Sequence, residues 1–455
     1  MGNIIKRSLA LLAVAAMAVS AAGCKGSGDG DKSAGKNNKD NNSLDLAEYT
    51  LDSDALLAQM PAELKGTKII FFNWYNPDDR EEKNVIQEFR EKSGIEVEYR
   101  VVDYGNYAQR LASDLSVGET PDVLRMRRID MGIMKTLQPL DVTGFDFSGK
   151  EWDHSTMQRY TFGDKCYGAA LVNTPFFLPT IMFYNKNTVE EMGFDNPWEL
   201  WKEGKWTWDT FKNMCTEWVN QGTEYTGCCL WGKPSQTVGA SFVKKNANDE
   251  YELDLTNELS LSAWKFVEEG VAAGLYTNLN DGFDQAKQKL LFASMDASAV
   301  QGSSEYFSKT RARGQLEGVP YPSGFNGTTE YYVPMMENIA FGIPKAAKNP
   351  KAVPYFLGYM CNFANYDQSV YDKSSNPNGF FFSEQIKECY MDLLGQPNRD
   401  MTYDNIFSYS GEISDATWVM FFKIDATQLN NWLFENEYIF KNSVDLYNAD
   451  CNSLK

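Results

Sequence analysis

Short runs of apolar residues alternate with stretches of helical spacing from residue 67 onward. Residues 67–73 (TKIIFFN) form an apolar run bounded by polar residues, which is typical of a buried strand. Residues 79–92 carry Val85 and Phe89 four positions apart, a spacing that puts both side chains on one helical face. The pattern therefore predicts a strand followed by an amphipathic helix.

The next elements continue this alternation. Residues 95–102 predict a second strand, residues 107–115 a second helix, and a third strand starts at Pro121. Gly94 suits the end of the first helix, because a helix C-terminus often needs a positive φ that glycine adopts without strain. This order predicts a mostly parallel sheet with helices on both faces, and such sheets bind ligands at the carboxyl ends of their strands.

The pattern repeats less regularly in the rest of the chain. We find no repeat of fixed period and no internal linker, so two α/β lobes with more than one crossover fit better than separate domains in a row. Four tryptophans between residues 198 and 208 surround a helix start and are interpreted as packing residues. The further elements predicted are strands at 180–184, 226–230 and 339–343, and helices at 208–220, 261–273, 284–291, from about 350, and over much of 416–448.

The beginning of the chain has the pattern of an export signal. Lys6 and Arg7 precede an apolar run at residues 9–19. At about 1.5 Å per residue this run is too short to cross a membrane core of about 30 Å. It leads to Ala-Ala-Gly-Cys ending at Cys24, which resembles a bacterial lipobox with a lipidated cysteine. An ordinary signal peptide with an incidental cysteine is the alternative.

The segment after Cys24 is polar. Residues 25–45 are built of Gly, Ser, Lys, Asp and Asn with almost no apolar side chains, so this segment is expected to be a flexible tether. We therefore expect a signal peptide at 1–23, a lipidated cysteine and tether at 24–63, and a globular body from residue 64. A lipid anchor would hold this body at the extracytoplasmic face of the bacterial cell membrane.

Composition excludes several classes of protein. The 455 residues include 62 Asp and Glu against 43 Lys and Arg, a net charge of −19 that argues against binding nucleic acid or an anionic membrane surface. A single histidine, His154, leaves little material for a histidine zinc site or a Ser-His-Asp mechanism. The eight cysteines include no Cys-x-x-Cys spacing, so most are interpreted as small buried hydrophobic residues. No metal and no cofactor is expected.

Landmark motifs occur in a fixed order along the body. They are Ile-Ile-Phe-Phe-Asn-Trp at 69–74, Gly-Ile-Glu-Val at 94–97, Gly-Glu-Thr-Pro-Asp-Val at 118–123, Leu-Gln-Pro-Leu-Asp at 137–141, Gly-Asp-Lys-Cys-Tyr-Gly at 163–168, Phe-Tyr-Asn-Lys at 183–186, Trp-Thr-Trp-Asp-Thr-Phe at 206–211 and Asn-Pro-Lys-Ala-Val at 349–353. In this order they resemble the family 1 extracellular solute-binding proteins of ABC importers, the class that contains maltose-binding protein. Ala170 departs from the family pattern, which usually has proline there.

This resemblance implies a two-lobed periplasmic-binding-protein-like α/β fold of type II, with lobes joined by hinge crossings. The implied mechanism is hinge closure around a small-molecule solute. The closed protein, expected to be a monomer, would then dock on the permease subunits of an ABC importer. The expected boundaries are 64–171 and 302–335 for lobe 1, 181–295 and 345–455 for lobe 2, and 172–180, 296–301 and 336–344 for the crossings.

Side chains after the first predicted strand are the leading ligand candidates. A sugar site needs an aromatic face for the C–H side of a pyranose ring and polar groups for its hydroxyls. Asn73, Trp74 and Tyr75 follow that strand at the edge that binds ligands in such sheets, although Trp74 could instead cap the lobe core. Asp78 could bind hydroxyls, or simply cap the next helix.

Charged residues after the third predicted strand, together with residues of the expected crossings, complete the candidate set. Arg127, Arg128 and Asp130 either contact the ligand or are merely solvated. The acidic net charge disfavours an anionic ligand unless the two arginines override it locally. Glu337 and Asn338 could bind hydroxyls or form a hinge hydrogen bond. The candidates that the resemblance implies on the crossings and cleft borders are Asn173, Phe176, Trp231, Gln301, Ser303, Glu337, Asn338 and Trp418.

The expected function is that of a substrate-binding lipoprotein of an ABC importer, which captures a mono- or oligosaccharide and is not an enzyme. One alternative is a secreted carbohydrate-active enzyme with two carboxylates flanking a glycosidic bond. No motif picks out such a pair among the 62 acidic residues. A sensory or adhesive lipoprotein with the same fold is the other alternative.

Overall fold

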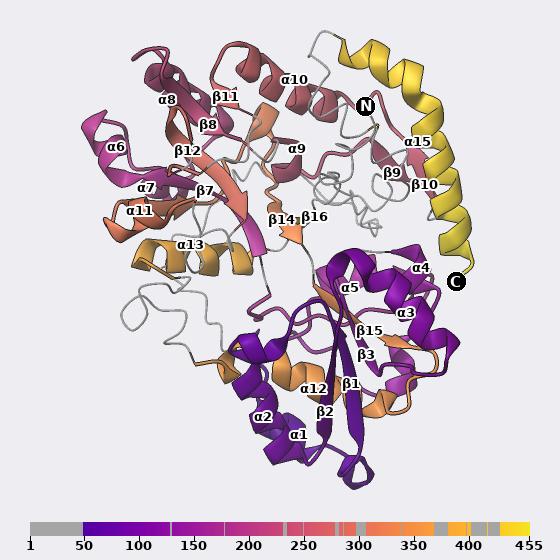
Figure 1. The fold of residues 1–455 in the computed structure, drawn as a ribbon. Helices are drawn as coiled ribbons and strands as arrows, with labels where there is room; N and C mark the ends of the chain where they lie inside the picture. The colour runs from indigo at the N-terminus through magenta and orange to yellow at the C-terminus, as the bar shows by residue number, and fades with distance from the viewer. Residues whose placement is uncertain are drawn as a thin grey trace, which may run out of the picture.

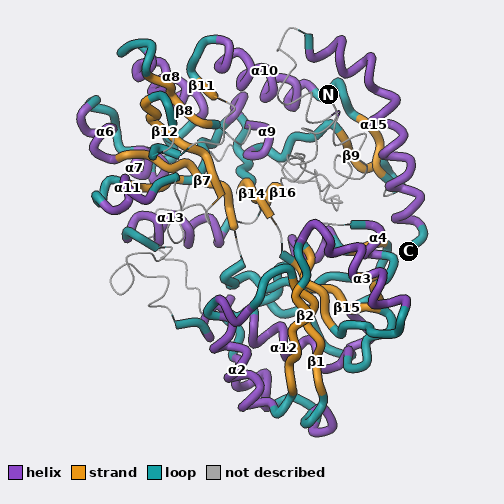
Figure 2. The backbone as a smooth tube through the Cα atoms, in the orientation of Figure 1, coloured by secondary structure: helices purple, strands orange, loops and turns teal. Residues whose placement is uncertain are grey.

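Two β-sheets with flanking helices organise the chain into two lobes in the computed structural model (Figure 1, Figure 2). The predicted two-lobed α/β fold is confirmed. The first sheet lies in the lower lobe of the view, and the second lies in the upper lobe. The structure describes residues 49–127, 130–176, 178–230, 234–248, 250–277, 282–284, 286–296, 306–337, 339–367, 381–396, 398–401, 416 and 428–455.

The first sheet contains five strands. Their spatial order is β2 (Glu96–Val101), β1 (Lys68–Asn73), β3 (Val123–Met126), β15 (Ala340–Pro344) and β4 (Leu137–Gln138). β1 pairs in parallel with β2 and β3, as the sequence predicts. β15 returns from a distant part of the chain and runs antiparallel to β3 and β4. The carboxyl ends of β1 and β3 therefore lie side by side.

Helices cover both faces of this sheet. Successive side chains of β1 point to opposite faces, so apolar residues on each face need a covering helix. Phe71 packs against Phe356 of α12 (Val353–Met360) at a centroid distance of 5.5 Å. The Phe356 ring also packs against Phe89 of α2 (Glu82–Ser93) at 5.5 Å. Phe72, on the opposite face, packs 4.7 Å from the ring of Tyr107 in α3 (Tyr107–Ser116). Burial of each such ring stabilises the fold by about 1.5–3 kcal/mol.

The second sheet contains seven strands. Along its main path the order is β11 (Tyr276–Thr277), β8 (Tyr225–Cys229), β12 (Lys289–Asp296), β7 (Leu178–Asn185), β14 (Val333–Glu337) and β16 (Arg399–Met401), and β13 (Leu316–Val319) also pairs with β7. β12, β13 and β14 are all antiparallel to β7, so this sheet is mixed rather than parallel.

The remaining elements are mostly short helices with side-chain caps. Thr207 caps α8 by accepting from Thr210 N at 3.2 Å, and Asn257 caps α10 by accepting from Ser260 N at 2.9 Å. Two small hairpins, β5 (Thr161–Phe162) with β6 (Lys165–Cys166) and β9 (Val243–Lys245) with β10 (Tyr251–Leu253), complete the strands. The other helices are α1 (Ser53–Ala58), α4 (Met131–Met134), α5 (His154–Arg159), α6 (Lys186–Glu191), α7 (Pro197–Lys202), α8 (Trp208–Val219), α9 (Pro234–Thr237), α10 (Glu258–Ala272), α11 (Ser308–Ala312), α13 (Glu384–Gly395) and α15 (Leu429–Asn452).

Several local predictions are confirmed. Gly94 ends α2 with a φ of 73°. The tryptophan cluster is structural: Trp206 donates to Pro320 O at 2.9 Å, and Trp208 donates to Thr237 Oγ1 at 3.0 Å. Both indoles are buried in the second lobe, where an indole N–H without a partner would be unfavourable.

The helix predicted at 284–291 is wrong. The chain enters strand β12 at Lys289, and the apolar residues Leu291 and Phe292 are completely buried in the sheet. β12 lies between β7 and β8 and forms hydrogen bonds with both. Pairing on two sides overrides the helical propensity of the preceding Lys- and Gln-rich residues, because propensity is a weak local preference.

The sheet topology revises the expected lobe boundaries. β13 falls in the range expected in lobe 1, but it pairs with β7 in the second sheet. β15 and α12 belong to the first lobe through β3 and α2, although residues after 344 were expected in lobe 2. The chain therefore crosses between the lobes before β7, between β14 and β15, and again between α12 and α13. Because β12 and β13 flank the expected crossing at 296–301 and both pair with β7, that crossing is not supported.

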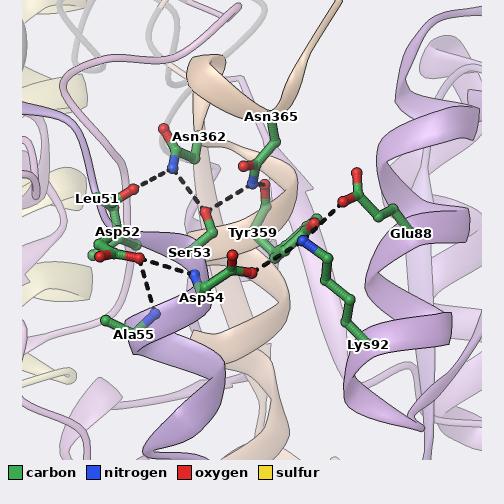
Figure 3. Close-up of polar contacts among 10 residues, drawn as sticks. All are labelled: Leu51, Asp52, Ser53, Asp54, Ala55, Glu88, Lys92, Tyr359, Asn362 and Asn365. Carbon is green, nitrogen blue, oxygen red and sulfur yellow. Dashed lines mark hydrogen bonds and ion pairs between the residues drawn. The ribbon is translucent and has the colours of Figure 1, made fainter.

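The first described residues pack on the first lobe and form what we call the N-terminal strap, residues 50–59 (Figure 3). Asn362 Nδ2 donates to Leu51 O at 2.6 Å and to Ser53 Oγ at 2.8 Å. Lys92 of α2 pairs with Asp54 at 3.0 Å. The strap lies within the range expected to be tether, 24–63, of which residues up to 48 lie outside the described part of the chain.

The C-terminal helix α15 contacts both parts of the molecule (Figure 1). Asp450 forms an ion pair with Lys135 of the first lobe, Nζ to Oδ1 2.5 Å. Asn448 exchanges two hydrogen bonds with the backbone of Tyr251 in the β9–β10 hairpin, at 2.8 and 2.7 Å. No helix within the described residues is both long enough and apolar enough to cross a membrane.

Candidate ligand-binding site

An aromatic and charged cluster forms at the carboxyl ends of β1 and β3. Asn73 is the last residue of β1, and Trp74 and Tyr75 follow it directly. Arg125 is the third residue of β3, and Phe176 lies on the segment that leads from the first lobe into β7. The cluster therefore combines the sheet edge where α/β proteins bind ligands with a crossing between the lobes.

Arg125 is the centre of this cluster. Its side chain is buried, and its guanidinium carbon lies 5.0, 4.6 and 4.2 Å from the ring centroids of Trp74, Tyr75 and Phe176. Its Nη1 atom is 3.3 Å from Glu82 Oε1. A guanidinium that contacts several aromatic faces and a carboxylate is held in one position, and cation–π contacts of this kind contribute about 0.5–2 kcal/mol each.

Glu82 is a buried carboxyl at the first turn of α2. It accepts a hydrogen bond from the Tyr75 hydroxyl in addition to the ion pair with Arg125. Burial raises the pKa of Glu82 to about 8, against the opposing influence of the Arg80 cation. Its Oε2 atom is buried without a hydrogen-bond partner among the described residues, and so is Nδ2 of Asn73. Buried unpaired polar atoms are unfavourable by about 1–3 kcal/mol each, so both atoms favour a polar partner.

Trp74 exposes part of its aromatic surface. The indole is half-buried and contacts Tyr104 and Tyr107 in T-shaped arrangements at centroid distances of 5.4 and 5.7 Å. The Arg127 guanidinium carbon lies 5.3 Å from the Tyr104 ring centroid. Trp74 therefore packs against the lobe core and also exposes part of its ring. The sequence left these open as two alternatives, a core cap or a ligand contact, and both fit.

The two acidic candidates lie outside the ring cluster. Asp130 caps α4, with Oδ1 accepting from Gly132 N at 2.8 Å and from Ile133 N at 3.2 Å. Asp78 is exposed in the turn before α2 and does not cap that helix, since Glu81 stands at the N-cap without a side-chain hydrogen bond. The structure does not bring Asp78 or Asp130 into the ring contacts around Arg125.

Asn173 is occupied by structural contacts. It is buried and donates from Nδ2 to Thr50 Oγ1 at 2.9 Å, while its backbone carbonyl accepts from Phe363 N at 3.1 Å. These bonds tie the first crossing to the N-terminal strap and to the segment after α12. Asn173 thus acts at the hinge side of the crossing, whereas Phe176 on the same crossing faces Arg125.

The other candidates are only partly visible. For Glu337 the backbone alone is described, where it pairs with Leu178 of β7. The candidates that lie outside the described residues are Arg128, Trp231, Gln301, Ser303, Asn338, Trp418 and the lipidation candidate Cys24.

Sequence reasoning missed three residues of the cluster, Arg125, Glu82 and Tyr104. Arg125 gave one readable signal, which is a charged side chain within an otherwise apolar strand. Glu82 gave none, because it stands in a helix start rich in charged residues. Within the described part of the chain, no group of three or more His, Cys, Asp or Glu side chains could hold a metal ion.

Comparison with known proteins places this geometry in a wider context. Residues 75–362 match the family model described as bacterial extracellular solute-binding protein. No match was found among curated protein sequences.

Solved structures share the two-lobed fold. The sugar-binding protein MalE from Xanthomonas citri has 12% sequence identity and a TM-score of 0.61, covering 84% of this chain and 99% of that one. The galacto-N-biose-/lacto-N-biose I-binding protein of Bifidobacterium longum, in complex with lacto-N-biose, has 15% identity and a TM-score of 0.58, covering 85% and 98%. The GacH receptor of Streptomyces glaucescens, solved unliganded and with acarbose, has 16% identity and a TM-score of 0.54, covering 86% and 99%. At these identities the similarity shows the fold.

Proposed function

This chain belongs to the family of bacterial extracellular solute-binding proteins, and from that premise we propose that it captures a mono- or oligosaccharide for an ABC importer. The family implies a location outside the cytoplasm. Its members bind and deliver solutes rather than transform them, so the proposed role is binding by hinge closure and delivery to permease subunits, as a monomer.

The cluster around Arg125 is the observation that carries the proposal. It offers a half-buried indole at Trp74 for the apolar face of a sugar ring. Beside it, Glu82 Oε2 and Asn73 Nδ2 are buried polar atoms without partners among the described residues, and hydroxyl groups could satisfy both. The solved structures with this fold include complexes with lacto-N-biose, acarbose and maltotetraose, which supports a saccharide as the ligand class.

The position of the cluster supports the proposed hinge closure. Phe176 contacts Arg125 from the segment that leads into β7, so part of the site moves with a crossing. A ligand that contacts both lobes favours the closed state by its extra contacts there, and that difference in affinity sets how far the population shifts.

Lipid anchoring at Cys24 is part of the proposal. The positive residues Lys6 and Arg7, the apolar run at 9–19 and the Ala-Ala-Gly-Cys sequence support it. Expression in a bacterium with radiolabelled palmitate should label the wild-type protein in the membrane fraction, whereas C24S should release unlabelled protein. Equal labelling of both proteins would rule out Cys24 as the anchor.

Calorimetric titration with a panel of saccharides tests the binding role. We expect at least one sugar to bind with a micromolar or lower Kd, and W74A to weaken that binding at least tenfold. Incubation with the same sugars should leave them intact by chromatography. Binding of an unrelated solute class in place of sugars would contradict the carbohydrate assignment, and turnover of an oligosaccharide would favour an enzyme instead.

A further inference from the structure

The first crossing between the lobes contacts both the second lobe and the candidate site within three residues. The carbonyl of Thr174 accepts a hydrogen bond from the Tyr390 hydroxyl of α13, in the second lobe, at 3.4 Å. Two positions later, the Phe176 ring centroid lies 4.2 Å from the guanidinium carbon of Arg125 and 6.1 Å from the ring centroid of Phe341 in β15. The conformation of this short segment therefore sets where one aromatic wall of the site stands relative to both lobes.

Asn173, directly before this segment, is held by bonds from two other parts of the chain. Its side chain is buried, and Nδ2 donates to Thr50 Oγ1 of the N-terminal strap at 2.9 Å. Its backbone carbonyl accepts from the N–H of Phe363, just after α12, at 3.1 Å. These two bonds fix the base of the first crossing to segments that do not themselves belong to it.

The N-terminal strap is in turn fixed to the first lobe by contacts that do not involve the first crossing (Figure 3). Asn362 donates to Leu51 O at 2.6 Å and to Ser53 Oγ at 2.8 Å, and Asn365 donates to the same hydroxyl at 2.8 Å. Gly358 of α12 packs closely on the strap, since a Cβ at this position would lie 2.8 Å from Leu51 Cδ2. A strap anchored in this way can act as a fixed support for the crossing.

From these contacts we infer that Asn173 is a positioning residue of the ligand site, which acts through its bond to the N-terminal strap by fixing the crossing that presents Phe176 to Arg125. This inference rests on the proposed function, because it assigns a support to the same site. Without the bond the crossing samples more conformations before a solute binds, and the apparent Kd rises by the inverse of the fraction that stays competent to bind. A competent fraction of about one third to one tenth corresponds to an affinity about three- to tenfold weaker.

The two roles open to Asn173 predict different effects of a substitution at Thr50. If the amide acts through the strap, N173A and T50V break the same hydrogen bond, so their effects on affinity should not add. If the amide contacts the solute directly, N173A weakens binding while T50V does not. The strap residue therefore separates a positioning role from a contact role.

Calorimetric titration with lacto-N-biose, acarbose and maltotetraose measures these effects. We expect N173A and T50V each to weaken binding of the tightest of these probes by about three- to tenfold, and the double variant to bind no more weakly than the weaker single variant. Melting temperatures should stay within a few degrees of wild type. D54N, which removes the ion pair between the strap and Lys92 but leaves the bond to Asn173, is the matched control and should bind like wild type.

Hydrogen exchange of the ligand-free protein gives a readout that does not depend on which solute binds. N173A and T50V should each speed amide exchange at residues 172–178 and at residues 74–76, beside the ring cluster. D54N should speed exchange in the strap alone. A general loss of stability would instead speed exchange in both sheets.

Each failure has its own signature. If N173A binds weakly while T50V binds and exchanges like wild type, Asn173 contacts the solute directly, and the positioning role is overturned while sugar binding stands. Wild-type affinity in both variants overturns it as well. If none of the saccharides binds, the proposed function fails, and wild-type exchange at residues 172–178 in both variants would then overturn the link between strap and crossing.

Discussion

The buried pair of Glu82 and Arg125 gives the first lobe a residue-scale dependence on pH. Glu82 has a folded-state pKa of about 8, raised by burial from 4.5. A raised pKa means that the folded protein holds the proton more tightly than the unfolded chain does. The contribution of Glu82 to stability is therefore fully present below about pH 4.5 and is lost as the pH rises towards 8.

We predict that E82Q removes this dependence. The free energy of unfolding of the wild type, relative to E82Q, should fall between pH 5 and pH 8 by on the order of 1 kcal/mol or more for each unit of pH. Urea denaturation of both proteins at pH 5, 6.5 and 8 measures this difference. Parallel stability profiles for the two proteins would show that Glu82 titrates normally.

Trp74 is the residue for which a binding defect should be separable from a folding defect. The indole is only half-buried, so W74A should destabilise the fold less than loss of a fully buried tryptophan does. We predict a loss of sugar affinity of about tenfold or more with a melting temperature within a few degrees of wild type. W201F in the second lobe, which loses the hydrogen bond to Asp392 and part of the indole ring, is the control and should bind normally.

The sequence located part of this site because some of its information is local. Trp74 and Tyr75 follow a strand that is readable from four consecutive apolar residues, so their place at the sheet edge was predictable. Asn173 was expected to contact ligand, but its amide bonds to Thr50, 123 positions earlier in the chain. Glu82 and its partner Arg125 stand 43 positions apart in the chain, and no local pattern encodes such a contact.

At the scale of elements, the strand β12 shows how neighbours decide secondary structure. The run Lys289–Asp296 contains apolar residues that are buried on both faces, and a continuous apolar run does not distinguish a strand from a buried helix. β1 was readable because polar residues bound its short apolar run, and α2 because its apolar residues stand four positions apart. β12 was not readable, because hydrogen bonding to both β7 and β8 determines its conformation.

The N-terminal strap is an element whose contribution can be measured. Asn362 is almost completely buried and donates to two atoms of the strap. N362A should remove the donor to Leu51 O, while Ser53 Oγ keeps the hydrogen bond from Asn365. We predict a loss of about 1–3 kcal/mol in the free energy of unfolding. N84A, an exposed asparagine on α2, should change stability by no more than about 0.5 kcal/mol.

Hydrogen exchange gives an independent readout of the same element. Amides of α1 and of the turn after α12 should exchange faster in N362A, while those of the second sheet should be unchanged. Faster exchange across both lobes would mean that the strap stabilises the whole fold rather than the first lobe.

At the scale of the whole molecule, the described elements imply crossings between the lobes at three places, and α15 contacts both lobes. The crossings precede β7, separate β14 from β15, and follow α12. Asp450 of α15 bonds to Lys135 below, and Asn448 bonds to Tyr251 above. Under the proposed hinge closure, the crossings bend while α15 keeps or exchanges these contacts.

We predict that ligand binding compacts the molecule. Small-angle X-ray scattering should give a smaller radius of gyration with saturating sugar, and W74A under the same conditions should scatter like the ligand-free protein. An unchanged radius of gyration in a sample that calorimetry shows to be saturated would contradict hinge closure.

The N-terminal strap also determines where mechanical load enters the molecule. A pull on residue 50 passes through Asn173 and Asn362 into the first lobe and into the bases of two crossings. The first lobe is then the fixed body, and the second lobe is free to swing. A protein held by its N-terminus, on a cell or on a sensor surface, would keep its closing motion, whereas attachment through α15 would load both lobes at once.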